Sequence, residues 1–119
     1  MVALVIAEPG RLRDAWRALL VAVPGIVEVH MADDAPAAMQ LVAARRPTLV
    51  LIDGELRDES APALVSQIKR LQPGARCIVL ACCTGQEWPH AQVEADAILV
   101  KGFPAARLFD TISRVLADA

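Results

Sequence analysis

The sequence has no excess of positive charge: 12 lysines and arginines stand against 14 aspartates and glutamates, for a formal net charge of −2. Proteins that bind nucleic acid usually carry a basic stripe, so we expect no nucleic-acid partner. The first apolar run follows no basic residues and is too short for a signal peptide or a membrane span. These absences favour a soluble cytoplasmic protein without a membrane partner.

Cysteine is also scarce. The three residues, Cys77, Cys82 and Cys83, are too few and too clustered for a disulfide framework. Vicinal cysteines form only strained disulfides, and the two thiols together with His90 make an incomplete set of zinc ligands. We therefore interpret Cys82 and Cys83 as packing residues at a strand end. No repeat or linker divides the chain, so residues 1–119 are expected to form a single domain.

The sequence is rich in hydrophobic residues, at 55%. Segments with the apolar pattern of strands alternate along the chain with segments that have helical periodicity. Five apolar segments of strand length occur, at residues 2–7, 26–31, 49–52, 77–82 and 97–100. The second of them alternates apolar and polar residues, which is typical of a strand near a sheet edge. Most of the others are apolar on both faces, so the sequence predicts an α/β fold with a five-stranded parallel sheet and helices on both faces.

Helical periodicity follows four of the strands. The expected helices span about 12–23, 35–45, 61–71 and 104–116, with Asp33 or Asp34 and Ser60 as candidate caps. The inward faces of the first and third are expected to carry Leu12, Ala15, Trp16, Leu19, Leu20 and Val23, and Leu64, Val65, Ile68 and Leu71. Between strands four and five the pattern is irregular, and Pro89 makes any helix there short or broken.

Charged residues stand where three of these strands end. Glu8 follows the first strand, Asp53 ends the third and Lys101 ends the fifth. In open parallel sheets, ligands bind outside the carboxyl ends of the strands, so these three side chains are expected to converge on one edge. The sequence alone leaves simpler alternatives: a turn aspartate, a solvated lysine, and for Glu8 an acid stabilised by the dipole of the first helix.

The motifs around these residues resemble the receiver domains of two-component response regulators, which have the CheY-like, flavodoxin-like (βα)5 fold. PTLVLID, residues 47–53, is similar to the strand that ends in the family's phosphoacceptor aspartate. ILVKGFP, residues 98–104, supplies the lysine that ends the last strand. LVIAEPGRLRDAWRALL, residues 4–20, aligns without a gap to the first strand, acidic pair and first helix. The resemblance covers the whole chain.

The resemblance implies a role for each residue. Asp53 would accept a phosphoryl group from a histidine kinase, and Lys101 would contact that group. Mg²⁺ would be held by Glu8, by Asp53 and by the backbone carbonyl of Glu55, which are oxygen ligands of the kind that Mg²⁺ prefers. The implied partners are a sensor histidine kinase or phosphotransfer protein and a downstream protein, with a homodimer left open. Such a domain is not an enzyme beyond catalysing its own phosphorylation and dephosphorylation.

The sequence also departs from the family pattern. Ala7 stands where the first acid of the pair belongs, which should weaken Mg²⁺ binding, and Ala81 replaces the Thr or Ser that ends the fourth strand. Ile98 replaces the usual aromatic switch residue in a chain without tyrosine, and Gly102 replaces a proline. A shifted loop could bring the hydroxyl of Thr84 near the site.

Three hypotheses follow from these matches and departures. The first is a phosphorylated receiver. The second is a pseudo-receiver, a protein-binding module of the same fold that works without phosphorylation. The third is a flavodoxin-like domain that binds a small ligand, although no Gly-rich phosphate loop follows the first strand. Trp88, in the irregular segment, is a candidate partner contact, whereas Trp16 is expected in the core.

Overall fold

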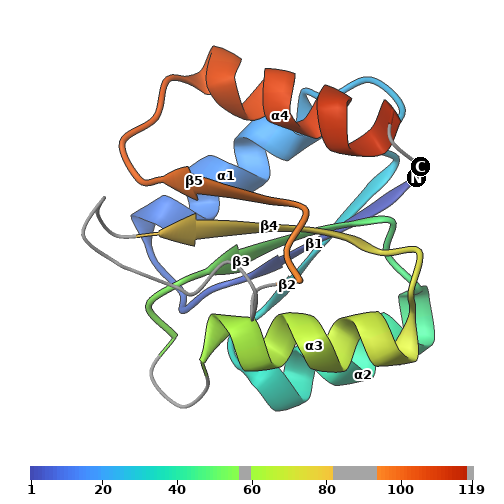
Figure 1. The fold of residues 1–119 in the computed structure, drawn as a ribbon. Coiled ribbons are helices and arrows are strands. Elements are labelled where there is room, and N and C mark those ends of the chain that lie inside the picture. Colours follow the sequence, from blue (N-terminus) through green and yellow to red (C-terminus); the bar gives the residue numbers. More distant parts are fainter. Residues whose placement is uncertain (57–59, 82–93, 118–119) are drawn as a thin grey trace.

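Five strands form one parallel sheet in the computed structural model, which describes residues 1–56, 60–81 and 94–117. The strands are β1 (Val2–Ile6), β2 (Glu28–Ala32), β3 (Leu49–Asp53), β4 (Arg76–Ala81) and β5 (Ala97–Val100). Their order across the sheet is β2-β1-β3-β4-β5 (Figure 1). The predicted parallel α/β sheet is therefore confirmed, and β2 lies at an edge, as its alternating pattern indicated.

Helices cover both faces of this sheet. They are α1 (Arg11–Val21), α2 (Ala35–Arg45), α3 (Ala61–Leu71) and α4 (Ala105–Ala117). In Figure 1, α1 and α4 lie on one side of the strands, and α2 and α3 lie on the other. The irregular segment around Pro89, where the sequence predicted at most a short or broken helix, lies outside the described residues. No helix in the described ranges combines the length and hydropathy that a bilayer crossing requires.

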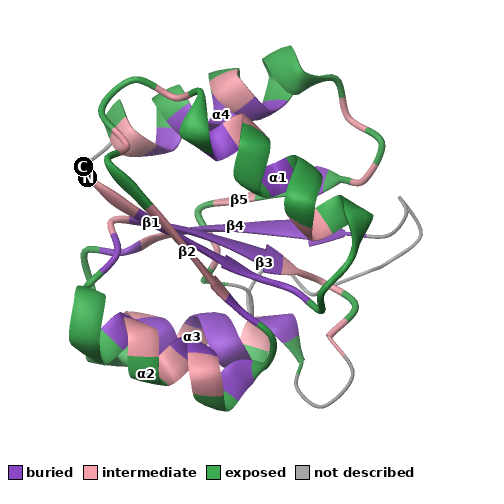
Figure 2. Cartoon of the chain, turned by 180° about the vertical axis from the view of Figure 1, so that it is seen from behind, coloured by how far each residue is buried: buried purple, intermediate pink, exposed green. Residues whose placement is uncertain are grey.

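The sheet separates two hydrophobic clusters, and the three inner strands contribute to both. Leu4, Val50 and Val79 face α2 and α3, whereas Val5, Leu51 and Leu80 face α1 and α4. Strands buried on both faces need continuous apolar runs, which is why β3 reads LVLI before its aspartate. Figure 2 shows this buried layer in purple between the two pairs of helices.

Two helices begin with the side-chain caps that the sequence predicted. Asp34 accepts a hydrogen bond from the amide of Ala37 at 3.0 Å, and Ser60 accepts one from the amide of Ala63 at 3.2 Å. Each helix also has a proline in its first turn, where the missing N–H costs nothing. The cap on Ser60 fixes where α3 starts after the loop that follows β3.

We expect Ser60→Ala to destabilise the protein by about 1 kcal/mol, because an amide at the start of α3 loses its acceptor. Urea unfolding measures the change. Ser60→Asp is the matched control, since its carboxylate can accept the same hydrogen bond and also faces the positive end of the helix dipole. Equal destabilisation by both variants would contradict a capping role.

On α1 and α3, the sequence predicted more inward-facing residues than the structure buries. Trp16 and Leu20 of α1 are buried, but Ala15 is exposed and Leu12 is 53% exposed. On α3, Leu71 is 45% exposed although it continues the periodic pattern. Leu12 lies in the first turn of α1, and Leu71 is the last residue of α3. Periodicity identifies a face of a helix, but it does not tell how much of that face the sheet covers.

Candidate functional site

Asp53 lies at the carboxyl end of β3, the position that the strand-end rule predicts. Its backbone pairs with Leu80 of β4, and its side chain is 16% exposed. The carboxylate oxygen Oδ1 accepts a hydrogen bond from the amide of Glu55 at 2.9 Å. This bond is the one expected of a turn aspartate, and it holds the carboxylate in a fixed direction at the sheet edge.

Lys101 reaches Asp53 from the end of β5. Its amide donates to the carbonyl of Ala81 at 2.7 Å, which continues the pairing of β5 with β4 by one residue. Its ammonium nitrogen Nζ lies 2.7 Å from Oδ1 of Asp53 and 3.5 Å from Oε2 of Glu55. The lysine side chain is only 13% exposed. The structure thus brings together two residues that are far apart in sequence, in a partly desolvated ion pair.

The surroundings of Lys101 favour its charged form. Burial by itself lowers the pKa of Lys101, but the hydrogen bond and charge of Asp53, with a contribution from Glu55, raise that pKa above the ordinary 10.5. The ammonium is therefore a permanent positive charge at neutral pH. It lies against the carboxylate oxygen Oδ1 of Asp53.

This pKa shift predicts how stability depends on pH. A group whose pKa is higher in the folded protein stabilises the fold fully below its unfolded pKa, and this contribution is lost as the pH rises through the folded pKa. We expect the wild type to lose stability relative to Lys101→Met as the pH rises above the ordinary lysine pKa of 10.5 and through the higher pKa of Lys101 in the folded protein. Urea unfolding over this range tests the expectation. A constant difference between the two proteins would contradict it.

Trp16 of α1 lies beside the same ammonium. Nζ of Lys101 is 5.8 Å from the centre of the indole ring, within the range of a cation–π contact. The tryptophan is 4% exposed and belongs to the core cluster under α1 and α4. The sequence predicted its burial but not its position beside the site. Because of this position, its fluorescence is a natural reporter of changes around Lys101.

The end of β1 lies next to Asp53. Ile6 pairs with Ile52, so Ala7 is level with Asp53 on the neighbouring strand. Ala7 is 2% exposed and offers only a methyl group where the resemblance implies a carboxylate. Glu8 follows it and is exposed at the same edge of the sheet. Glu8 thus lies one residue beyond the position level with Asp53, and its role as a magnesium ligand stays a prediction.

Sequence reasoning missed a guanidinium at this edge. Nη1 of Arg13, in the first turn of α1, lies 3.4 Å from the carbonyl oxygen of Ala7 and also pairs with Asp33. Asp33 follows β2, so the strand-end rule, applied to the second strand as well, would have identified it. The Arg13 side chain is 14% exposed, and it holds the ends of β1 and β2 together.

The predicted magnesium ligands have suitable chemistry. Two carboxylates and a backbone carbonyl are the oxygen donors that Mg²⁺ prefers. Among the described residues, the amide of Glu55 and the ammonium of Lys101 both contact Oδ1 of Asp53. Within the described ranges, no three His, Cys, Asp or Glu side chains form a cluster able to hold a metal. A metal here would depend on Asp53, Glu8, the carbonyl of Glu55 and bound water.

The structure also describes three of the positions at which the sequence was expected to depart from the family pattern. Ala81, which ends β4, is 4% exposed and has no hydroxyl, so its only polar contribution is the carbonyl that accepts from Lys101. Ile98 on β5 is 39% exposed. Gly102 has φ +91°, a conformation that side chains with a Cβ rarely adopt and that proline cannot adopt.

Several predictions fall outside the described residues. These are the packing role of Cys82 and Cys83, the zinc alternative with His90, and the proposals for Thr84 and Trp88. Cys77, by contrast, is described: it is a free and fully buried thiol in β4.

Solved structures share this fold. The receiver domain of NtrX from Brucella abortus is 26% identical, with a TM-score of 0.86 over 98% of this chain and 99% of that one. A LuxR-family response regulator from Aurantimonas sp. SI85-9A1 is 22% identical, with a TM-score of 0.87 over 98% and 85%. The signal receiver domain of an HD domain-containing protein from Pseudomonas fluorescens Pf-5 is 24% identical, with a TM-score of 0.83 over 98% and 94%.

A search among curated proteins finds no match. The family model of the response regulator receiver domain, however, matches residues 3–113, which is nearly the whole chain. This family consists of signalling modules of two-component systems that interact with histidine kinases and downstream effectors, and its members typically bind Mg²⁺ at the phosphorylation site. The order of strands and the pairing of Asp53 with Lys101 agree with that match. This chain therefore belongs to the response regulator receiver domain family.

Proposed function

We propose that this receiver domain accepts a phosphoryl group on Asp53 from the phosphohistidine of a sensor histidine kinase or a phosphotransfer protein. The observation that carries the proposal is the 2.7 Å contact between Nζ of Lys101 and Oδ1 of Asp53 at the carboxyl edge of the sheet. It pairs a nucleophilic oxygen with a cation that can bind the transferred group. The single domain that we propose for residues 1–119 would signal through contacts with another cytoplasmic protein.

The reaction requires little from the protein beyond position and charge. An oxygen of Asp53 attacks the phosphorus atom, a P–O bond forms, and the P–N bond to the histidine breaks as the imidazole keeps the electron pair and takes up a proton. Lys101 then exchanges part of its contact with Asp53 for an oxygen of the phosphoryl group. Since the ammonium is already desolvated and in place, this exchange needs little reorganisation.

Asp53, Glu8 and the backbone carbonyl of Glu55 are the residues that would hold Mg²⁺. When bound, the cation offsets the negative charge that gathers between the carboxylate and the phosphoryl group. Ala7 contributes no charge at the position level with Asp53, so we propose that this site binds Mg²⁺ more weakly than one with a complete acidic pair.

A pseudo-receiver is the second candidate, and two observations favour it. The fourth strand ends in Ala81, which has no hydroxyl for a phosphoryl oxygen, and Ala7 offers no carboxylate at the position level with Asp53. In that case the ion pair between Lys101 and Asp53 would be a structural element, and the protein would bind its partner in one fixed state, alone or as a homodimer.

Treatment with Mg²⁺ and a small phosphodonor distinguishes the two candidates. A receiver gains the mass of one phosphoryl group, which intact-mass spectrometry detects, and beryllofluoride should change the fluorescence of Trp16, 5.8 Å from Lys101. The measurement is made in Trp88→Phe so that one tryptophan reports. If the protein shows no mass gain and no fluorescence change at millimolar donor, the phosphorylated receiver is excluded and the pseudo-receiver remains.

A further inference from the structure

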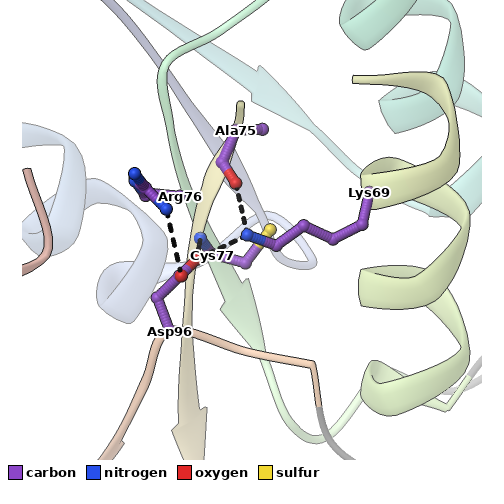
Figure 3. Close-up of polar contacts among 5 residues, drawn as sticks. All are labelled: Lys69, Ala75, Arg76, Cys77 and Asp96. Carbon is purple, nitrogen blue, oxygen red and sulfur yellow. Dashed lines mark hydrogen bonds and ion pairs between the residues drawn. The ribbon is translucent and has the colours of Figure 1, made fainter. Parts of the chain in front are cut away.

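A compact group of polar contacts surrounds Asp96 (Figure 3). Asp96 precedes the first residue of β5, whereas Asp53 is the last residue of β3, so the two lie at opposite ends of the parallel strands. Oδ2 of Asp96 accepts hydrogen bonds from Nζ of Lys69 at 2.7 Å and from the amide of Cys77 at 2.8 Å. Oδ1 lies 3.6 Å from Nη1 of Arg76. Lys69 comes from the last turn of α3, and the other two residues begin β4. The carboxylate of Asp96 therefore links the start of β5 to α3 and to the inner strand β4.

The backbone strengthens this junction. The amide of Asp96 donates to the carbonyl of Cys77 at 2.8 Å, so these two residues are bonded in both directions. Lys69 also donates to the carbonyl of Ala75 at 2.6 Å. The side chains of Lys69 and Asp96 are only 15% and 21% exposed. Contacts that are partly shielded from water hold their geometry better than ion pairs at the open surface.

The thiol of Cys77 does not compete for Lys69. Burial, with smaller contributions from Asp96 and Glu94 and against an opposing one from Lys69, raises the pKa of this thiol to about 12. The thiol therefore stays protonated and uncharged at neutral pH. Asp96 is the carboxylate that pairs with the lysine.

β5 has fewer contacts to determine its position than the inner strands have. The strand has four residues and pairs on one side only, with β4. Two of its four side chains, Ile98 and Val100, are 39% and 37% exposed. Leu99 is the one buried side chain of this strand and favours a single register, and contacts at the strand ends add to that preference.

The register of β5 determines where Lys101 lies. Asp96 immediately precedes the strand, and Lys101 immediately follows it. A slip of one residue would move Lys101 along the strand by about 3.3 Å and turn its side chain to the other face of the sheet. Either change would break the 2.7 Å contact with Asp53.

We infer that Asp96 and Lys69 form a positioning pair that sets the register of β5 and thereby holds the ammonium of Lys101 against Asp53. The inference rests on the proposed function only in giving Lys101 a role in phosphoryl transfer. The positional effect itself concerns the ion pair between Lys101 and Asp53, whatever the site does.

Amide hydrogen exchange, followed by NMR, tests the pair. In Asp96→Asn, which keeps an acceptor for the amide of Cys77 but loses the charge that binds Lys69, we expect the amide of Lys101 to exchange on the order of tenfold faster. In Lys69→Met, which leaves the carboxylate in place, the same amide should also exchange faster. The double variant should exchange no faster than the more affected single variant.

The amides of Leu4 and Val5 in β1 report global unfolding in the same spectra, because both residues are buried in the middle of the sheet. Glu28→Gln is the matched control: it removes the acid of the Glu28–His30 pair on β2, the other edge strand, and should leave Lys101 unchanged. Equal acceleration of the Lys101 and β1 amides in Asp96→Asn, or additive effects in the double variant, would overturn the inference.

A second measurement separates this inference from the proposed function. The wild type and Asp96→Asn are treated with Mg²⁺ and a phosphodonor. If both the proposed function and the positioning role are correct, Asp96→Asn forms the phosphorylated protein several-fold more slowly than the wild type, and its Lys101 amide exchanges faster. A wild type that gains no phosphoryl group contradicts the proposed function alone, and an unchanged exchange rate at Lys101 contradicts the positioning role alone.

Discussion

Asp53→Asn is expected to abolish the mass gain that Mg²⁺ and a small phosphodonor produce in the wild type. The amide is isosteric with the carboxylate but has no anionic oxygen to attack phosphorus. Its carbonyl oxygen can still accept from the amide of Glu55 and from Lys101, so the turn after β3 should persist. Intact-mass spectrometry measures the loss, and beryllofluoride should no longer change the fluorescence of Trp16.

The matched control is Asp110→Asn, which makes the same chemical change at an exposed position on α4. It should gain the phosphoryl group as the wild type does. If Asp53→Asn gained the same mass as the control, the phosphoryl group would be on another residue, and the assignment of Asp53 as acceptor would be wrong.

Ala7→Asp is expected to raise the affinity for Mg²⁺ on the order of tenfold or more, because it adds a second carboxylate level with Asp53. The same change should lower stability in the absence of Mg²⁺ by about 0.5–3 kcal/mol, since it places a charge at a position that is 2% exposed and close to another carboxylate. Mg²⁺ should restore that stability. Thermal unfolding with and without Mg²⁺ measures both effects.

Ala7→Asn separates charge from size in this experiment. It has almost the same shape as the aspartate but adds no negative charge, so it should not gain affinity for Mg²⁺ to the same extent. Arg13 provides a competing outcome, because its guanidinium already bonds the carbonyl of Ala7 and could pair with the new carboxylate. If Ala7→Asp were more stable than the wild type without Mg²⁺, the new carboxylate would be paired with Arg13, and the expected gain in Mg²⁺ affinity would be wrong.

The fold could be predicted from the sequence because its strongest signals are local. The run from Leu49 to Ile52 must be buried on both faces, and only an inner strand of a covered sheet provides that environment. Once the sheet is parallel, the carboxyl ends of its strands share an edge. The approach of Lys101 to Asp53, across 48 residues of sequence, therefore followed from topology without knowledge of any side-chain contact.

The remaining parts of the site depend on how far a side chain reaches from a helix or a loop, and periodicity carries no such information. Arg13 bonds the carbonyl of Ala7 only because α1 begins at Arg11, and that boundary follows from the turn after β1. Trp16 fills the core, as predicted, but its approach to Lys101 requires α1 and β5 to share one face of the sheet. Asp96 was missed because its role lies at the start of β5, away from the edge that the ligand rule describes.

The backbone at Gly102 sets this position apart from Ala7 and Ala81, two other positions at which the sequence was expected to depart from the family pattern. Ala7 and Ala81 have ordinary backbone angles, since Arg46 is the one non-glycine residue with positive φ in the described part of the chain. An aspartate or a threonine could replace them by single substitutions on the existing backbone. Gly102→Pro could not occur alone, because proline requires φ near −65° and this residue has +91°. A proline at residue 102 would therefore require a different turn after Lys101, whereas the changes at residues 7 and 81 would not.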